Sequence, residues 1–294
     1  MSKSRGAVRR QVILGVVPVL LAWALRLYRL EAQSFWYDEG YCAFVAALSP
    51  AEIWRWTARE FTPPLYHLAL ASWLPLAGWT EFAARFLSAW AGTLVVAGMM
   101  RLGDDLGPRP TGLLAALLAS LSPFYLWHSQ DARMYMLQAL FGLLGTLLLI
   151  RALRKPARRG LWIGVAVLDA LTLYAHTTGG FLLLFHALVI IVASVRSPAR
   201  LARWKWGGLA LGGAVLAWLP WLIYALPFLG ENAGYWPGRL NWRFVVSGAF
   251  RGFVTGEMIE GAAETTTLWV WGVACLVGVV GGFLPRPDSP GAAL

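Results

Sequence analysis

Long apolar runs recur along this 294-residue chain and constrain its fold more than any other feature. A helix of about 20 apolar residues crosses the hydrocarbon core of a bilayer. The chain is 58% hydrophobic and only 14% charged, whereas soluble domains carry about 25% charged residues. The sequence therefore predicts an all-α integral membrane protein with about eight transmembrane helices. The expected spans are 11–28, 82–100, 111–127, 134–150, 161–175, 178–195, 206–224 and 267–284.

The basic residues predict how the chain is oriented. With a cytoplasmic N-terminus, five segments face inward: 1–10, 101–110, 151–160, 196–205 and 285–294. These segments hold 16 of the 25 Lys and Arg, as the positive-inside rule requires. The net charge of +10 is thus a topology signal, and no nucleic-acid partner is expected. The first span lacks a small-residue cleavage site, which favours a signal anchor over a cleaved signal peptide.

Two long loops, 29–81 and 225–266, are predicted on the outer face, with short ones at 128–133 and 176–177. The long loops are rich in Trp, Tyr, Phe and Pro, which indicates ordered and functional segments. We therefore expect any chemistry on this side of the membrane.

The first long loop contains two candidate interfacial helices. Ser49-Pro50 followed by Glu52 is a helix start, because Ser caps, Pro suits the first position and Glu favours the positive end. The helix that follows, AEIWRWTARE, is expected to lie on the membrane surface. A second apolar stretch, LYHLALASWLPL, comes after a proline pair. Together these helices are expected to cover an outward-facing cavity.

Asp38 and Glu39 stand in SFWYDEGYCAF, directly after the first span. One interpretation is a helix cap, in which Asp38 starts a helix over GYCAFVAAL and Glu39 feels its dipole. The other is a catalytic carboxylate at the lipid interface, where apolar neighbours increase its basicity. The pair alone does not decide between them.

Polar residues also crowd into SPFYLWHSQDARMYML, between the third and fourth spans. Asp131 could cap the fourth span while Arg133 reaches the headgroups. Alternatively Arg133 binds a phosphate, since a guanidinium grips two phosphate oxygens. In the fifth span, Asp169 and His176 share a helical face. A structural hydrogen bond to a neighbouring helix is favoured for Asp169, and a place in a site for His176.

The order and spacing of five motifs resemble those of a known family. They are SFWYDE, PPLYH, EFAARFLSAWAGTL, LSPFYLWHSQDARMY and YAHTTGG. From about residue 20 to 195 the chain resembles the bacterial members of glycosyltransferase family 39. These are relatives of the dolichyl-phosphate-mannose protein mannosyltransferases and of the aminoarabinose lipid A transferases, membrane enzymes of the GT-C fold.

The resemblance implies an inverting glycosyltransferase that moves a sugar from a polyprenyl-phosphate donor to a lipid, glycan or protein acceptor. It implies that Asp38 and Glu39 are catalytic, Asp38 being the base that deprotonates the acceptor. Cationic groups should stabilise the leaving phosphate. By position, the candidate substrate-binding residues are Tyr66, His67, Arg85, His128, Gln130, Asp131, Arg133, Tyr135 and His176, and Arg85 and Arg133 are the candidates for binding the leaving phosphate. A multi-pass protein of the bacterial plasma membrane, with its site on the outer face, is the expected setting.

Two departures from the family pattern keep alternatives open. Relatives usually extend further, so a truncated, non-catalytic scaffold is one alternative; a lipid-linked sugar flippase is another. FTPP has Thr62 where many relatives have His. No Cys/His cluster has metal-ligand spacing, so no cofactor is assigned and a divalent metal is left open.

The expected organisation is a GT-C-like core whose first outer loop is catalytic, followed by a second outer loop and one last span. Its segments are a basic N-terminus at 1–10, the core at 11–224 with the loop 29–81, the outer loop 225–266, a helix at 267–284 and a tail at 285–294.

Overall fold

The computed structural model describes residues 2–108, 110–230, 248, 251–254 and 265–273. Contacts divide the chain into two units, the first comprising 1–121 with 125–237 and the second 122–124 with 238–294. Most of the outer loop predicted at 225–266, and most of the last span predicted at 267–284, lie outside the described residues.

The described part of the chain is all-helical, as the sequence predicts. Its longer helices are α1 (Ser2–Leu27), α5 (Glu81–Leu106), α6 (Thr111–Leu121), α8 (Tyr135–Arg154), α9 (Arg159–Ala175), α10 (Gly179–Ser194) and α11 (Arg200–Ala225), which a short turn η1 (Leu226–Phe228) extends. Three segments are long and apolar enough to cross a membrane, namely Glu81–Leu106, Tyr135–Arg154 and Arg200–Phe228. They match three of the eight expected spans.

The third expected span, 111–127, is not one helix. The first part of it is α6, which ends at Leu121, and α7 (Pro123–Ser129) begins two residues later. Proline has no backbone N–H and its ring clashes with the preceding turn, so Pro123 suits the first turn of a helix and is costly in its interior. The hydropathy of the run is high on both sides of this break, which is why the run looked continuous in sequence.

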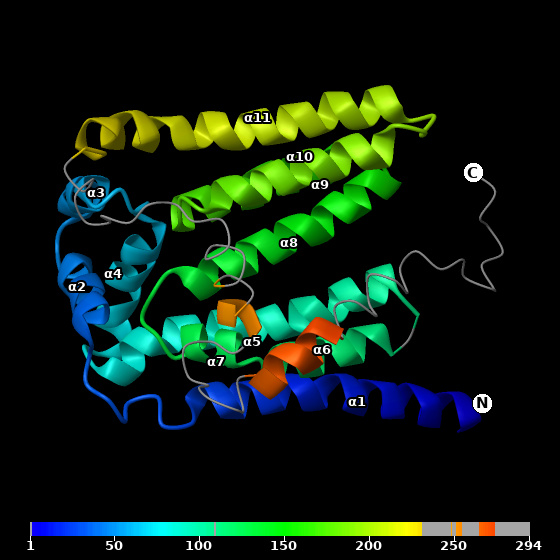
Figure 1. Ribbon diagram of the computed structural model, residues 1–294, viewed down its shortest axis with the longest axis horizontal. Helices are drawn as coiled ribbons and strands as arrows, with labels where there is room; N and C mark the ends of the chain where they lie inside the picture. Colours follow the sequence, from blue (N-terminus) through cyan, green and yellow to red (C-terminus); the bar gives the residue numbers. More distant parts are fainter. Residues whose placement is uncertain (1, 109, 231–247, 249–250, 255–264, 274–294) are drawn as a thin grey trace. The chain divides into compact units, whose positions relative to one another are not determined.

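Three helices, not two, form the loop 29–81 that is predicted on the outer face: α2 (Tyr37–Ala46), α3 (Pro50–Arg59) and α4 (Leu65–Ala77). They gather at one end of the long helices (Figure 1). The predicted cap of α3 is confirmed, since the Ser49 backbone N–H donates to Glu52 Oε2 at 3.0 Å and the Glu52 N–H donates to Ser49 Oγ at 3.4 Å. The additional helix is α2, which the helix-cap interpretation of Asp38 anticipated.

Apolar packing fixes these short helices to the bundle. Cys42 of α2 and Tyr66 of α4 are fully buried in one cluster with Ala84 of α5 and Leu137 of α8. Burial of a side chain as large as that of Leu137 contributes roughly 1.5–3 kcal/mol. The loop helices are therefore an ordered part of the fold.

A cluster of charged side chains lies at the end of the bundle away from α2, α3 and α4. Near the C-terminus of α5, Asp105 pairs with Arg101 at 3.1 Å and with Arg151 of α8 at 3.3 Å. This cluster is separated from the start of α5 by about 36 Å at 1.5 Å per residue. The arginines around Asp105 and the aromatic loop 29–81 thus lie at opposite ends of α5.

Candidate active site

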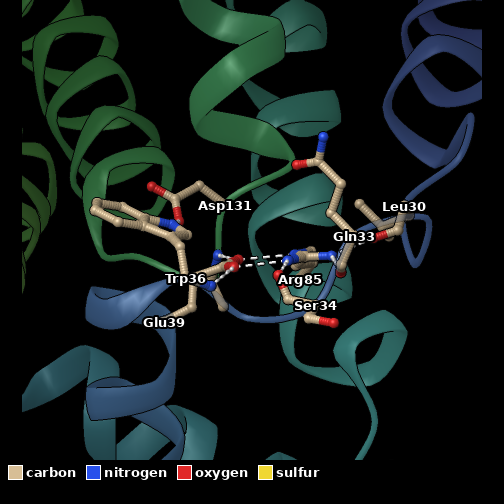
Figure 2. A network of polar contacts seen from close by, with 8 residues as sticks. Leu30, Gln33, Ser34, Trp36, Glu39, Arg85 and Asp131 are labelled. Carbon is tan, nitrogen blue, oxygen red and sulfur yellow. Dashed lines mark hydrogen bonds and ion pairs between the residues drawn. The ribbon is translucent and has the colours of Figure 1, made fainter.

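Arg85 connects the loop 29–81 to α5 with every donor it has. Its Nε and Nη2 donate to the two carboxylate oxygens of Glu39 at 2.7 and 2.6 Å (Figure 2). Nη1 donates to the carbonyls of Leu30 and Gln33 at 2.9 and 2.8 Å. Nη2 also donates to the Ser34 carbonyl at 3.2 Å. All five N–H groups of the guanidinium are thereby used.

Glu39 likewise uses both of its carboxylate oxygens in hydrogen bonds. Besides the ion pair, its Oε1 accepts a hydrogen bond from the Ala132 backbone N–H at 2.8 Å, and Oε2 accepts one from the Trp36 N–H at 3.4 Å. Only 1% of the residue is exposed. Bonds of this kind to a buried carboxylate are charge-assisted and strong. Glu39 therefore joins α2, α5 and the segment before α8, and none of its surface is left for a substrate.

Asp38 has a different environment although it is the next residue. Its side chain is 34% exposed, and its Oδ2 lies 3.4 Å from Nη2 of Arg133. Its backbone carbonyl also accepts a hydrogen bond from Arg133 Nη1 at 3.5 Å. Successive residues of a helix point about 100° apart, so α2 presents Glu39 to the bundle and Asp38 to its open side. Asp38 is thus the carboxylate of the pair that a substrate can reach.

The guanidinium of Arg133 lies over the ring of Tyr135, and rings from two other elements pack against that ring. The guanidinium stands over the ring of Tyr135 at 5.7 Å, and that ring lies 4.6 Å from His128 and 5.7 Å from His176, centre to centre. The structure therefore brings together four of the residues predicted from the two short outer loops.

The imidazoles near Arg133 are neutral at pH 7. Burial, reinforced by the charge of Arg133, lowers the pKa of His67 and of His128 to about 4. The same two causes lower the pKa of His176, whose Nδ1 lies 2.8 Å from Thr178 Oγ1. Because a neutral imidazole both donates and accepts, these rings can bind hydroxyl groups.

Asp131 is a second carboxylate of unusual character. Burial raises its pKa to about 6, and the charges of Glu39 and Asp38 add to that shift. The Trp36 indole opposes it by donating to Asp131 Oδ1 at 3.1 Å (Figure 2), as does the positive charge of Arg133. This hydrogen bond also connects the loop 29–81 to the segment before α8.

Gln130 belongs to the framework of the fold. Its amide nitrogen donates to the carbonyls of Leu25 and Arg26 at 3.2 Å each and of Tyr28 at 2.9 Å. The last carbonyls of a helix have no partner within it, so this side chain caps α1. Gln130, like Arg85, was expected to line the site, but its amide nitrogen instead bonds to backbone carbonyls at the end of α1.

Tyr66 is fully buried on α4, with its ring 6.0 Å from that of His67. Burial, above all other causes, raises its pKa well above the usual value. Both side chains are thus buried on α4, and both are uncharged at pH 7.

Sequence reasoning missed two residues of α2 in this region. Cys42 Sγ lies 3.8 Å from Arg133 Nη1, and the ring of Tyr41 lies 6.3 Å from that of His67. Tyr41 and Cys42 are three and four residues after Asp38, so a helix places them on its side. A helix beginning at Asp38, as the helix-cap interpretation has it, would have predicted that Tyr41 and Cys42 lie on the same side as Asp38.

Asp169 makes the structural hydrogen bond that was favoured for it. His186 of α10 lies 3.1 Å from its carboxylate through Nδ1 and 3.0 Å from Thr146 of α8 through Nε2. Both Asp169 and His186 are fully buried. His176 caps α9 and belongs to the other cluster, so the shared helical face did not place these two residues in one site.

The residues that the structure describes include no group of three His, Cys, Asp or Glu side chains placed to hold a metal ion. The arrangement instead offers one accessible carboxylate, one cation beside it and several neutral groups able to donate and accept hydrogen bonds. Such a set can take a proton from a hydroxyl and stabilise a departing anion.

Comparison with protein-family models gives one match. The model described as dolichyl-phosphate-mannose-protein mannosyltransferase covers residues 61–224, more than half of the chain. Tyr66, His67, Arg85, the segment 128–135 and His176 fall within the match, whereas Asp38 and Glu39 precede it. A comparison with curated proteins found no match.

Proposed function

We propose, since this chain belongs to the dolichyl-phosphate-mannose-protein mannosyltransferase family over residues 61–224, that it transfers a sugar from a polyprenyl-phosphate donor with inversion. Family membership implies a glycosyltransferase that uses a lipid-linked sugar. The observation that carries the finer proposal is the contrast between Asp38, open and beside Arg133, and Glu39, buried and fully bonded.

Asp38 is the general base in this proposal. The acceptor hydroxyl gives its proton to the Asp38 carboxylate as its oxygen attacks the anomeric carbon. The bond from that carbon to the phosphate oxygen breaks, and its electron pair leaves with the lipid phosphate. One attack from the opposite face inverts the anomeric centre, and Asp38 later returns the proton to water. A positioned base of this kind contributes about 10²–10⁴-fold in rate.

Arg133 stabilises the leaving phosphate. Of the two arginines expected to do so, Arg85 has no free donor, whereas Nε of Arg133 has no hydrogen-bond partner among the described residues. A phosphate that approaches Arg133 would replace its 3.4 Å contact with Asp38 and leave that carboxylate to the acceptor. We therefore assign Glu39 and Arg85 to positioning and Arg133 to phosphate binding.

The same proposal includes the topology. Eight spans would place 11–224 in a GT-C-like core, with the loops 29–81 and 225–266 and the active site on the outer face of the bacterial plasma membrane. The helices α2, α3 and α4 would then lie at the interface where a lipid-linked donor meets a water-borne acceptor. The acceptor is a lipid, glycan or protein hydroxyl.

The test is sugar release or transfer from radiolabelled polyprenyl-phosphate sugars by the purified protein, comparing wild type with Asp38→Asn. We expect turnover to fall at least 10²-fold, because the amide cannot accept the proton. Glu60→Gln, an exposed carboxylate of the same loop, is the control and should retain wild-type turnover.

Three results would contradict the proposal. Equal turnover in wild type and Asp38→Asn would remove the assignment of the base. Translocation of the intact donor across vesicles, without transfer and in both proteins, would favour the flippase alternative, and neither activity with any donor would favour the scaffold.

A further inference from the structure

His67 is a buried polar side chain with no partner in the described part of the chain. It lies on α4 and is 1% exposed, yet neither Nδ1 nor Nε2 makes a hydrogen bond there. The hydroxyl of Tyr41 on α2 is also buried and has no partner among those residues. A buried polar group left without a hydrogen bond costs about 1–3 kcal/mol, so each such group in a fold calls for an explanation.

These groups lie together beside the proposed reaction centre. The rings of Tyr41 and His67 stand edge to face, 6.3 Å apart between centres. Both side chains feel the charge of Arg133, which also contacts Asp38 at 3.4 Å. The unpartnered atoms thus come from two helices and occupy the buried side of the site, whereas Asp38 occupies its exposed side.

The chemistry of the pair suits hydroxyl groups better than a phosphate. A phosphate oxygen only accepts hydrogen bonds and is best bound by cations, which Arg133 supplies. A neutral imidazole offers one donor and one acceptor, and a phenol offers both from one oxygen. A ring with neighbouring hydroxyls can satisfy all of these at once, because each hydroxyl also donates and accepts.

We infer that His67 and Tyr41 bind hydroxyl groups of the donor's sugar ring and thereby help to select the sugar. The inference rests on the proposed function, which places the donor phosphate at Arg133 and the acceptor at Asp38. A sugar attached to that phosphate has to lie close to Arg133, and the buried side of the site is where the unpartnered groups are.

The experiment separates sugar recognition from phosphate recognition by measuring binding in detergent. The probes are sugar-free polyprenyl phosphate and the polyprenyl phosphates of mannose, glucose, galactose and arabinose. Wild type should bind one sugar-bearing lipid more tightly than the sugar-free lipid. His67→Phe should reduce that preference about tenfold or more, the effect of losing one or two hydrogen bonds, and leave affinity for the sugar-free lipid unchanged.

Tyr41→Phe removes only the hydroxyl and should also reduce the preference for the sugar-bearing lipid. Tyr37→Phe, on the same helix and 81% exposed, is the matched control and should change neither affinity. His67→Phe removes two groups that bond to nothing in the described chain, so its melting temperature should not fall below that of wild type. This readout distinguishes a role in binding from a role in folding.

An unchanged preference in His67→Phe would overturn the inference, as would equal binding of the sugar-free lipid and every sugar-bearing lipid by wild type. Because the readout is binding, it does not depend on turnover. A protein that binds a sugar through His67 but transfers nothing would contradict the proposed function and not this inference.

Discussion

The surroundings of Asp131 make its contribution to the stability of the protein depend on pH. Burial raises the pKa of its carboxyl to about 6, with Glu39 and Asp38 adding to the shift and Trp36 and Arg133 opposing it. An acid whose pKa is raised by folding is bound to its proton more tightly in the folded state. Its contribution to stability is therefore complete below the ordinary pKa near 4 and is lost as the pH rises through 6.

We predict that Asp131→Asn gains stability relative to wild type as the pH rises from 4 to 7. The full difference is about 3 kcal/mol if the pKa shift is about two units, and the asparagine oxygen can still accept from Trp36. Melting temperatures of both proteins in detergent, measured at several pH values, check this. A constant difference between the two proteins across this range would contradict it.

The neighbouring carboxylates Asp38 and Glu39 also differ because of their surroundings. They are adjacent in sequence and equal in chemistry, and only their directions from α2 distinguish them. One meets the buried donors of Arg85 and Ala132, and the other meets Arg133 at a partly open position. Their different proposed roles follow from this single difference.

Among the secondary-structure elements, α2 depends most on a buried ion pair. Glu39, in the first turn of α2, bonds to Arg85 of α5 and to the segment before α8. Glu52 holds the corresponding position in α3, but the hydrogen bonds that its carboxylate makes are with Ser49 and are exposed to solvent. The two glutamates are therefore a natural pair for comparison.

We predict that Glu39→Gln destabilises the protein by about 3–5 kcal/mol, because it leaves the charge of Arg85 buried without its counter-ion. Glu52→Gln should change stability little. Thermal unfolding of both variants gives the comparison. The double variant Glu39→Gln/Arg85→Gln should be destabilised by less than the sum of the two single effects, since the unpaired charge is gone. A double variant destabilised by the sum of the single effects would contradict the coupling.

At the scale of the whole molecule, the first unit keeps its basic ends and its aromatic loop helices apart. The cluster around Asp105 lies at the far end of α5 from Arg85. This separation agrees with the positive-inside rule if the loop helices lie outside the cytoplasm. The orientation can be tested directly.

We predict that a membrane-impermeant maleimide labels Arg55→Cys in intact cells but labels Arg158→Cys only after lysis. Both positions are exposed, one in α3 and one before α9. The background should carry alanine in place of Cys42 and Cys275. Labelling of Arg158→Cys in intact cells, with Arg55→Cys protected, would reverse the proposed topology.

The sequence by itself determined the all-helical character, the long apolar helices α5, α8 and α11, and the cap of α3 at Ser49. Each depends on residues close in the chain: a run long enough to cross a bilayer, or a serine three residues before a glutamate. The grouping of Arg133 with His128 and Tyr135 was also foreseeable, because these residues lie within eight positions.

Tertiary structure decided the roles that depend on distant partners. Arg85 and Gln130 looked like site residues, but Arg85 meets Glu39 and Gln130 meets the end of α1. Asp169 and His176 share a helical face, but Asp169 pairs with His186 of another helix. Local sequence sets which way a side chain points from its helix, whereas the neighbour it meets depends on how the helices pack.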